Sequence, residues 1–306
     1  MHNKTEVSIM GKKKVIIYSL TRRGFFSEII NLLIAKTYAD INNYDFRVNS
    51  FFWNCRIQKG LRDYFIKTYN EDNSVFTAYL TRGSVVKFNL KDPKSYLHNV
   101  MHLLNKIYSI YNQKVIYANE IFGTDLTKES QYKIKYVENF RSFFYLNNKV
   151  EQIVQRNKEQ FDLPKEYIGV HVRRGDKITT KEMGKIEMET YVDSILQKSG
   201  ELKCKNIYVA TDDVNVISFL STSHELTSLS LYWNKNISQD GFVEYDFNRK
   251  SKVDKFIETT NLLTDIIILK ESIFFIGTYS SNLSRVIPLF LGFDKCSSLD
   301  KEWYLG

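Results

Sequence analysis

The densest run of potentially reactive side chains in this 306-residue sequence follows a short apolar segment. It reads Ile168-Gly-Val-His-Val-Arg-Arg-Gly-Asp-Lys177. Adjacent arginines present fixed forks of hydrogen-bond donors that match phosphate oxygens, and a lysine adds a movable positive charge. An arginine pair alone is more typical of a solvated basic turn. The histidine and the aspartate of the same stretch favour a site that binds phosphate groups.

Two other polar clusters also follow apolar segments directly. They are Thr211-Asp212-Asp213 and Ser280-Ser281-Asn282. The serine-rich cluster begins a predicted helix, where free backbone amides and the helix dipole favour an anion, although an ordinary helix cap has the same sequence. Asp212 and Asp213 can bind ligand hydroxyl groups or cap the helix predicted from Val214, and capping accounts for only one of them.

Asp265 lies inside the most apolar predicted helix, which extends from Val253 to Lys270. An unpaired carboxylate in such surroundings costs free energy, so we expect Asp265 to have a partner. A structural ion pair and a carboxylate that accepts two hydrogen bonds from guanine are both compatible with this position.

The elements predicted around these clusters are short strands that alternate with helices. The strands are expected at Tyr167–Val172, Asn206–Ala210, Leu226–Tyr232 and Ile273–Thr278. This alternation is typical of an α/β fold with a parallel sheet and crossover helices. Ligands of such sheets bind beyond the carboxyl ends of the strands. We therefore expect the three polar clusters at one edge of one sheet.

The first half of the chain predicts a strand over Lys13–Leu20 and a helix from about Ser27, whose hydroxyl group can cap it. Apolar residues at helical spacing predict a second helix from near Pro93 through Ile110. A third helical region covers residues 134–160, with a break at Asn147. We place a boundary between two lobes at residues 162 and 163.

Several function classes lose support because their motifs are missing. The sequence contains no GxxxxGK[ST], GxGxxG, HExxH or Asp-x-Asp motif, which argues against a P-loop phosphotransferase, a dinucleotide dehydrogenase, a zincin and a metal-dependent sugar transferase. The three cysteines lack the spacing of a zinc site or a disulfide framework. No apolar run is long enough for a membrane span. These features predict a cytoplasmic protein without a bound metal.

Four segments, in the same order, resemble motifs of the α-1,6-fucosyltransferase family. Ile168–Lys177 is similar to the family's HVRR-x-DK segment, Ile207–Asp213 to its VYVATDD strand, Leu263–Ile266 to its LDI segment, and Thr278–Asn282 with Arg285 to its TFSSQ…R segment. The likeness extends from about Val137 to Leu291 and is weak before that. Gly175 departs from the family's core N-glycan enzyme, which has threonine there.

The resemblance implies a two-lobed, GT-B-like glycosyltransferase. Residues 1–162 would form an N-terminal α/β lobe on the acceptor side, and residues 163–306 a C-terminal Rossmann-like lobe that binds the nucleotide sugar. The implied reaction is an inverting, metal-independent transfer of fucose from GDP-fucose to a hydroxyl group of a glycan or glycoconjugate, with no cofactor. The partners are this donor and its acceptor, with no nucleic acid and no membrane span.

The resemblance also implies a role for each candidate residue. His171 and Asp265 would recognise guanine, Arg173 and Ser281 would hold the β-phosphate, and Asp212 and Asp213 would help to organise the donor site. Arg174, Asp176 and Lys177 would shape the reacting centre, and Glu182 would accept the proton of the acceptor hydroxyl group. Glu182 lies one residue farther from the Asp-Lys pair than in the family, and Glu187 is the alternative base.

Two other functions stay open. The first is a transferase of the same fold that uses another nucleotide sugar, since contacts to guanine and pyrophosphate do not read the sugar. The second is a non-catalytic protein that binds nucleic acid or an anionic surface, which the net charge of +8 permits. Salt-sensitive binding without turnover of a sugar nucleotide would favour the second.

Overall fold

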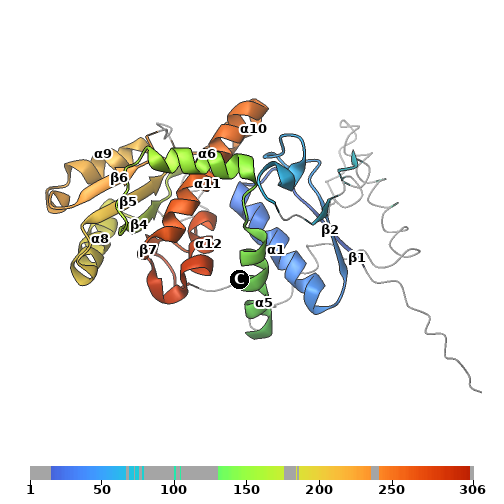
Figure 1. Cartoon of the computed structure of the whole chain (residues 1–306), viewed down its shortest axis with the longest axis horizontal. Coiled ribbons are helices and arrows are strands. Elements are labelled where there is room, and N and C mark those ends of the chain that lie inside the picture. The colour runs from blue at the N-terminus through green and yellow to red at the C-terminus, as the bar shows by residue number, and fades with distance from the viewer. Residues whose placement is uncertain are drawn as a thin grey trace, which may run out of the picture.

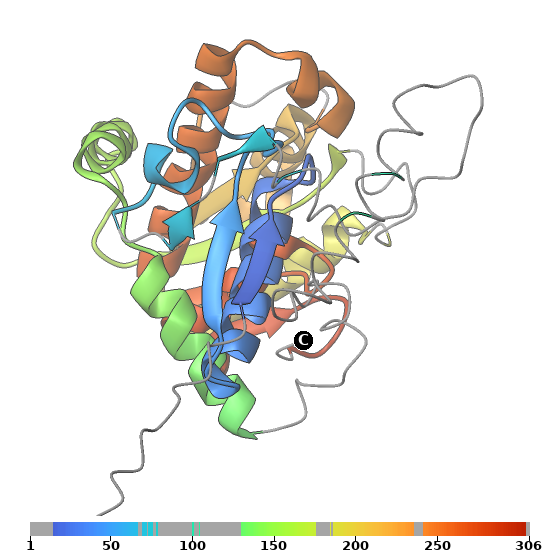
Figure 2. The ribbon, with the colours of Figure 1, turned by 90° about the vertical axis from the view of Figure 1, so that its right-hand side faces the viewer.

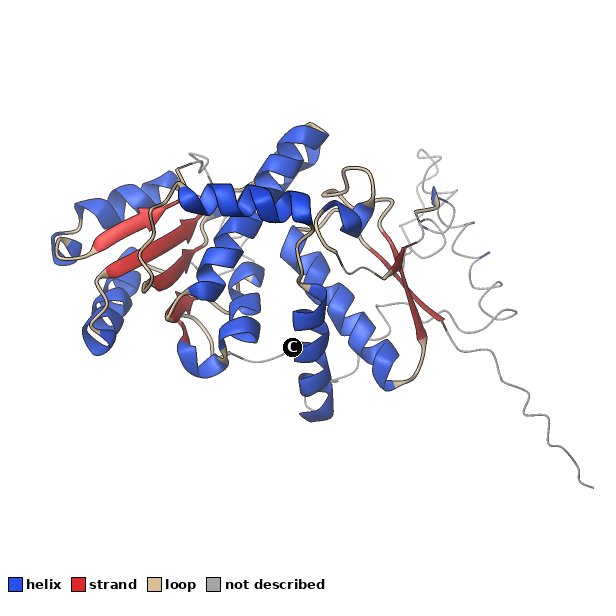
Figure 3. Ribbon diagram, in the orientation of Figure 1, coloured by secondary structure: helices blue, strands red, loops and turns tan. Residues whose placement is uncertain are grey.

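The strands of the protein form two separate parallel sheets with helices between them (Figures 1 and 3). The computed structural model describes residues 15–66, 69–71, 73–75, 78, 100, 104, 130–175, 184, 186–235 and 241–303. The N-terminal sheet has the order β1-β2-β3 and the C-terminal sheet the order β6-β5-β4-β7-β8. The predicted α/β fold with a C-terminal parallel sheet is confirmed.

The N-terminal sheet is built around a strand–helix–strand unit with parallel strands. Strand β1 (Val15–Ser19) leads into helix α1 (Phe25–Ile41), which returns the chain to β2 (Asp45–Asn49) and β3 (Asn70–Glu71). Figure 2 shows β1 and β2 side by side, in the parallel register Val15 with Asp45. The predicted cap is wrong, because α1 begins two residues before Ser27 and Gly24 occupies its N-cap position.

In the described part of the chain, two helices precede the C-terminal sheet. Helix α5 (Ser130–Phe143) is followed by α6 (Asn148–Glu159), and the predicted break at Asn147 is confirmed. The Asn147 side chain caps α6 by accepting a hydrogen bond of 3.0 Å from the backbone amide of Val150. The helix predicted from Pro93 lies outside the described residues, apart from Val100 and Leu104.

The C-terminal sheet has β4 (Ile168–Val172) at its centre, between β5 (Asn206–Thr211) and β7 (Phe274–Gly277). The outer strands are β6 (Ser230–Trp233) and β8 (Cys296–Ser298). The described helices of this half are α8 (Met188–Leu202), α9 (Val214–Thr222), α10 (Glu244–Arg249), α11 (Lys252–Glu271) and α12 (Asn282–Leu291). The predicted strand from Leu226 begins too early, because Leu226 is buried in a 3-10 turn that packs beside α8.

One hydrophobic core extends from the N-terminal sheet to one face of the C-terminal sheet. It joins Ile16 of β1 and Ile29 of α1 to Phe140 of α5, Ile266 of α11 and Val286 of α12, all of them fully buried. A second, smaller core covers the opposite face of the C-terminal sheet, beneath α8 and α9. The boundary that we place at residues 162 and 163 falls between α6 and β4 and stays a prediction.

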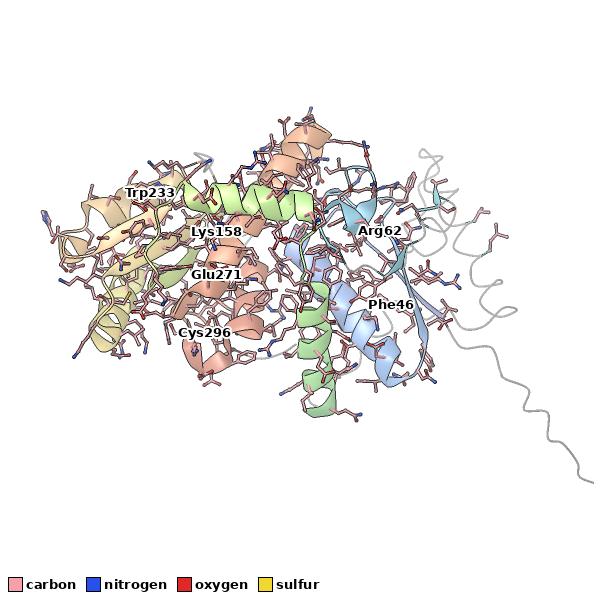
Figure 4. The ribbon with its side chains drawn as sticks, in the orientation of Figure 1. Phe46, Arg62, Lys158, Trp233, Glu271 and Cys296 are labelled. Carbon is pink, nitrogen blue, oxygen red and sulfur yellow. The ribbon has the colours of Figure 1, made fainter. Side chains whose placement is uncertain are left out.

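Helices α6 and α11 also meet at the surface. Lys158 of α6 and Glu271 of α11 form an ion pair of 2.5 Å in the middle of the molecule (Figure 4). The second half of α11 is buried, as its sequence predicts, with Leu263, Ile268 and Leu269 inaccessible to solvent. Among the helices in the described part of the chain, none has the length and apolar character that a membrane crossing requires.

Candidate active site

A cavity of about 460 Å³ lies between α1 and the carboxyl edge of the C-terminal sheet. Gly24, Phe25 and Asn54 line it from the N-terminal half of the chain. The residues that line it from the other half include His171, Arg173, Thr211, Asp212, Asp265, Ser281 and Asn282. The three polar clusters therefore meet at one edge of the sheet, as expected for parallel strands.

The Asp212 carboxylate joins three segments at this edge. Its Oδ2 atom accepts hydrogen bonds from Nη1 of Arg173 at 2.5 Å and from the backbone amide of Phe242 at 3.1 Å. Its Oδ1 atom accepts one of 2.8 Å from the backbone amide of Arg174. The Arg173 guanidinium also lies 5.2 Å from the centre of the Phe242 ring. These contacts fix the orientation of Arg173 at the cavity wall.

Asp213 has a different environment from its neighbour. It is the N-cap of α9, and its Oδ1 atom accepts hydrogen bonds from the backbone amide of Asn215 at 2.8 Å and from the Asn215 side chain at 2.9 Å. Asp213 does not line the cavity. Asp213 therefore caps a helix, whereas Asp212 lies at the cavity.

Arg174 does not line the cavity. Its Nη1 atom donates to the backbone carbonyl of Ile186 at 2.8 Å and so tethers the segment that precedes α8. Its Nη2 atom is buried and has no hydrogen-bond partner among the described residues. Asp176, Lys177 and Glu182 lie outside the described residues. Glu187, the alternative base, is exposed at the N-cap position of α8 and does not line the cavity.

Gly175 touches the backbone of a distant loop. A Cβ atom on Gly175 would lie 2.4 Å from the carbonyl oxygen of Phe242 and 2.6 Å from Oδ2 of Asp212. Gly241 has a φ of +76°, and a Cβ atom there would lie 2.7 Å from Cα of Gly175. The glycine at position 175 thus permits direct contact between two backbones.

Replacing Gly175 by alanine is expected to lower the free energy of unfolding by about 1–3 kcal/mol, because the added methyl group forces the 241–243 loop off Asp212. Gly200 is a matched control, since nothing lies within 4 Å of its Cβ position. Gly200→Ala lies inside α8 and should leave stability unchanged or slightly raised. Urea denaturation of both variants measures the difference. Equal stabilities would contradict the close contact.

His171 is an uncharged ring at the end of β4. It is only 4% exposed, and its Nδ1 atom lies 2.7 Å from Oγ of Ser284 on α12. Burial, with a smaller contribution from nearby Arg173, lowers the pKa of His171 to about 3. At neutral pH the imidazole therefore faces the cavity as a neutral hydrogen-bonding group.

Asp265 has neutral partners among the described residues. The Tyr208 hydroxyl group donates to its Oδ1 atom at 2.7 Å, and the Asn234 side chain hydrogen-bonds the same carboxyl group. Burial raises the pKa of Asp265 to about 7, while these two hydrogen bonds oppose the rise. An ion pair, one of the two roles that the sequence leaves open, is thus not the role of this carboxyl group in the described part of the chain.

The beginning of α12 contributes Ser281 and Asn282 to the cavity, and Ser281 occupies the N-cap position without a side-chain cap bond. Ser280 does not line the cavity. Its backbone amide and that of Tyr279 donate to Asp300, at 3.0 Å and 2.6 Å. Asp300 therefore anchors the turn that presents Ser281.

Sequence reasoning did not identify Asp300, or the segment that follows β6. Asn234, Phe242, Asp246 and Lys250 of that segment line the cavity. Its position after a strand of the same sheet is a signal that could have found it. Among the described residues there is no group of three or more His, Cys, Asp or Glu side chains that could hold a metal ion. Cys55, Cys204 and Cys296 are buried free thiols.

One family model matches a large part of this chain. Residues 126–288, more than half of the 306-residue chain, match the family model described as alpha-(1,6)-fucosyltransferase N- and catalytic domains. Comparison with curated protein sequences gives no match. Solved structures of several fucosyltransferases share the fold.

The fucosyltransferase NodZ from Bradyrhizobium is 14% identical, with a TM-score of 0.54 over 92% of this chain and 94% of that chain. POFUT1 in complex with GDP-fucose is 9% identical, with a TM-score of 0.54 over 97% and 99%. FUT1 of Arabidopsis thaliana in complex with GDP is 14% identical, with a TM-score of 0.53 over 92% and 69%. At these identities the likeness shows the fold, which is the two-sheet GT-B architecture. By the extent of the family match, the chain belongs to the alpha-(1,6)-fucosyltransferase family of enzymes.

Proposed function

We propose that this enzyme transfers fucose from GDP-fucose to a hydroxyl group of a glycan, with inversion and without a metal ion. The observation that carries the proposal is the cavity, where Arg173, His171, Asp265 and Ser281 converge in a chain of this family. Solved relatives in complex with GDP-fucose support the choice of donor. We place the reaction in the cytoplasm, which the three free thiols support.

The nucleotide would lie along the carboxyl edge of the sheet. The ionised Asp265 carboxylate can accept hydrogen bonds from the two adjacent N–H donors of guanine, and neutral His171 can add a further one. Arg173 can form a forked contact to the phosphates. The free backbone amides at the beginning of α12 supply a second anion contact beside Ser281.

Catalysis would follow from fixed charge at the leaving group. Negative charge develops on the departing diphosphate in the transition state, and a guanidinium already oriented by Asp212 stabilises it without reorganisation. This role of Arg173, together with the lack of an Asp-x-Asp motif, supports transfer without a metal ion. We assign Glu182 as the base that accepts the acceptor's proton, with Arg174, Asp176 and Lys177 shaping the reacting centre.

Thermal unfolding with candidate donors tests the proposal, because a ligand that binds only the folded state raises Tm. GDP and GDP-fucose should raise Tm with and without EDTA, and UDP-glucose should not. GDP-fucose should then be consumed when a glycan acceptor is present. A response to uridine nucleotides alone would assign another donor. Salt-sensitive binding of nucleic acid without any response to nucleotides would favour a non-catalytic protein.

The affinity for GDP-fucose is expected to rise about tenfold between about pH 6 and pH 8, because Asp265 has a pKa of about 7 and binds guanine only when ionised. Below this pKa the Asp265 carboxyl group must release its proton before guanine can bind, so the affinity rises with pH. GDP-fucose is the appropriate probe because its phosphates do not titrate near neutral pH, and His171 stays neutral there. Calorimetric titration measures the profile. Asp265→Asn should flatten it, and a flat profile in the unmodified enzyme would refute this role.

A further inference from the structure

The Asp265 carboxyl group, which we propose binds guanine, accepts a hydrogen bond from a strand of the C-terminal sheet. Tyr208 of β5 is completely buried, and its hydroxyl group donates to Oδ1 of Asp265 at 2.7 Å. Asp265 lines the cavity, as does its second partner, Asn234, whereas Tyr208 does not. An effect of Tyr208 on a ligand in the cavity would therefore be indirect, and Asp265 is its hydrogen-bond partner at the cavity wall.

We propose that Tyr208 is a positioning residue for nucleotide recognition, which keeps the Asp265 carboxylate ionised and fixed at the cavity wall. The inference rests on the proposed function, because it concerns the group that would bind guanine. A phenol that donates to a carboxylate stabilises its charged form and its rotamer. The donor is strong here because the pair is shielded from water.

The pKa of Asp265 depends on burial and on two hydrogen-bond partners. Burial raises its pKa, and the hydrogen bonds from Tyr208 and Asn234 lower it, with no charged neighbour among the causes. Besides Tyr208, the described titratable or charged residues on the elements packed against α11 and around the cavity are His171, Arg285, Lys149, Glu151, Arg156, Lys158, Glu159, Arg173, Asp212, Asp246, Lys250, Cys55 and, on α11 itself, Glu258. Of the two hydrogen bonds that lower the pKa of Asp265, the one from Tyr208 has the larger effect.

Tyr208→Phe removes this donor, and Tyr167→Phe is a matched control. Tyr167 is also buried, and its hydroxyl group donates to the same helix, at 2.8 Å from the backbone carbonyl of Ile268, without touching Asp265. General loosening of α11 should appear in both variants. A change in the ionisation of Asp265 should appear only in Tyr208→Phe.

The experiment is the pH profile of GDP-fucose affinity for the unmodified enzyme and both variants. We expect the midpoint in Tyr208→Phe to move up by about one pH unit, with binding roughly tenfold weaker at about pH 6 and little changed well above the midpoint. Tyr167→Phe should keep the original midpoint. A pH-dependent unmodified enzyme whose midpoint is unchanged in Tyr208→Phe would overturn the inference and leave the proposed function intact.

The ligand-free protein provides a separate measurement, should GDP-fucose fail to bind. The folded carboxyl group holds a proton that the unfolded chain releases between about pH 4 and pH 7. Stability should therefore fall as pH rises through this window. In Tyr208→Phe the fall should continue to a pH about one unit higher, and in Tyr167→Phe it should not. Coincident profiles for the two variants would overturn the positioning role without reference to any donor.

Discussion

Arg173→Ala is expected to lower kcat/KM for fucosyl transfer by about 10³-fold or more, in the range found for other preorganised donors at a departing phosphate or oxyanion. Arg173 is the guanidinium of the arginine pair that lines the cavity, and Asp212 and the Phe242 ring already fix its orientation. Its loss removes positive charge from the place where negative charge develops in the transition state. The effect should therefore be larger on kcat than on the affinity for the donor. Steady-state kinetics with GDP-fucose measure both.

Two further variants sharpen this test. Arg173→Lys keeps the charge but loses the planar fork, and it should retain an intermediate activity, about 10- to 100-fold below the unmodified enzyme. Arg249→Ala is the control, because Arg249 also lies against an aromatic ring, that of Tyr245, but is exposed on α10 outside the cavity. Its activity should be unchanged. Near-normal transfer by a folded Arg173→Ala enzyme would remove Arg173 from the mechanism.

Asp212→Ala should lower transfer by about 10²-fold or more and also lower the free energy of unfolding by about 3–5 kcal/mol. The Asp212 carboxylate pairs with Arg173 and accepts hydrogen bonds from the backbone amides of Arg174 and Phe242. Its removal takes this ion pair from a partly buried guanidinium and leaves the two amides without this acceptor. The activity loss follows because Arg173 then loses the ion pair that helps to fix its orientation.

Asp213→Ala is the natural comparison, one residue away. It removes only the cap of α9, which should cost about 0.5–2 kcal/mol of stability and leave transfer nearly unchanged. Denaturation and kinetics on the two variants decide between the roles. If Asp213→Ala impaired transfer as strongly as Asp212→Ala, the division of labour between these neighbours would be wrong.

The local sequence is sufficient to predict the sheet edge at which the site forms. The strands β4, β5 and β7 are short apolar runs, and a polar cluster follows each of them, so the parallel-sheet rule alone brings His171, Asp212 and Ser281 together. The break at Asn147 was also readable, because an asparagine there can cap the next helix. These features depend on residues close together in the chain.

The features that escaped prediction depend on contacts between distant residues. Which aspartate of the 212–213 pair serves the site is decided by Arg173 and by Phe242, which follows β6. Asp300 anchors the turn before α12 from beyond the edge strand β8, and no local pattern marks it. The start of α1 was misplaced because a glycine took the N-cap position that serine usually prefers.

The single core that links the two sheets has a consequence for chimeric proteins. Two halves of a chain that fold independently meet at a surface, so one of them can be exchanged with little disturbance. Here both halves contribute to the core, in which Phe140 and Ile29 belong to the same buried cluster as Ile266 and Val286. A transplanted half would have to match that packing side chain by side chain. Exchange of one half of this chain for that of another protein is therefore expected to lower the stability of the product.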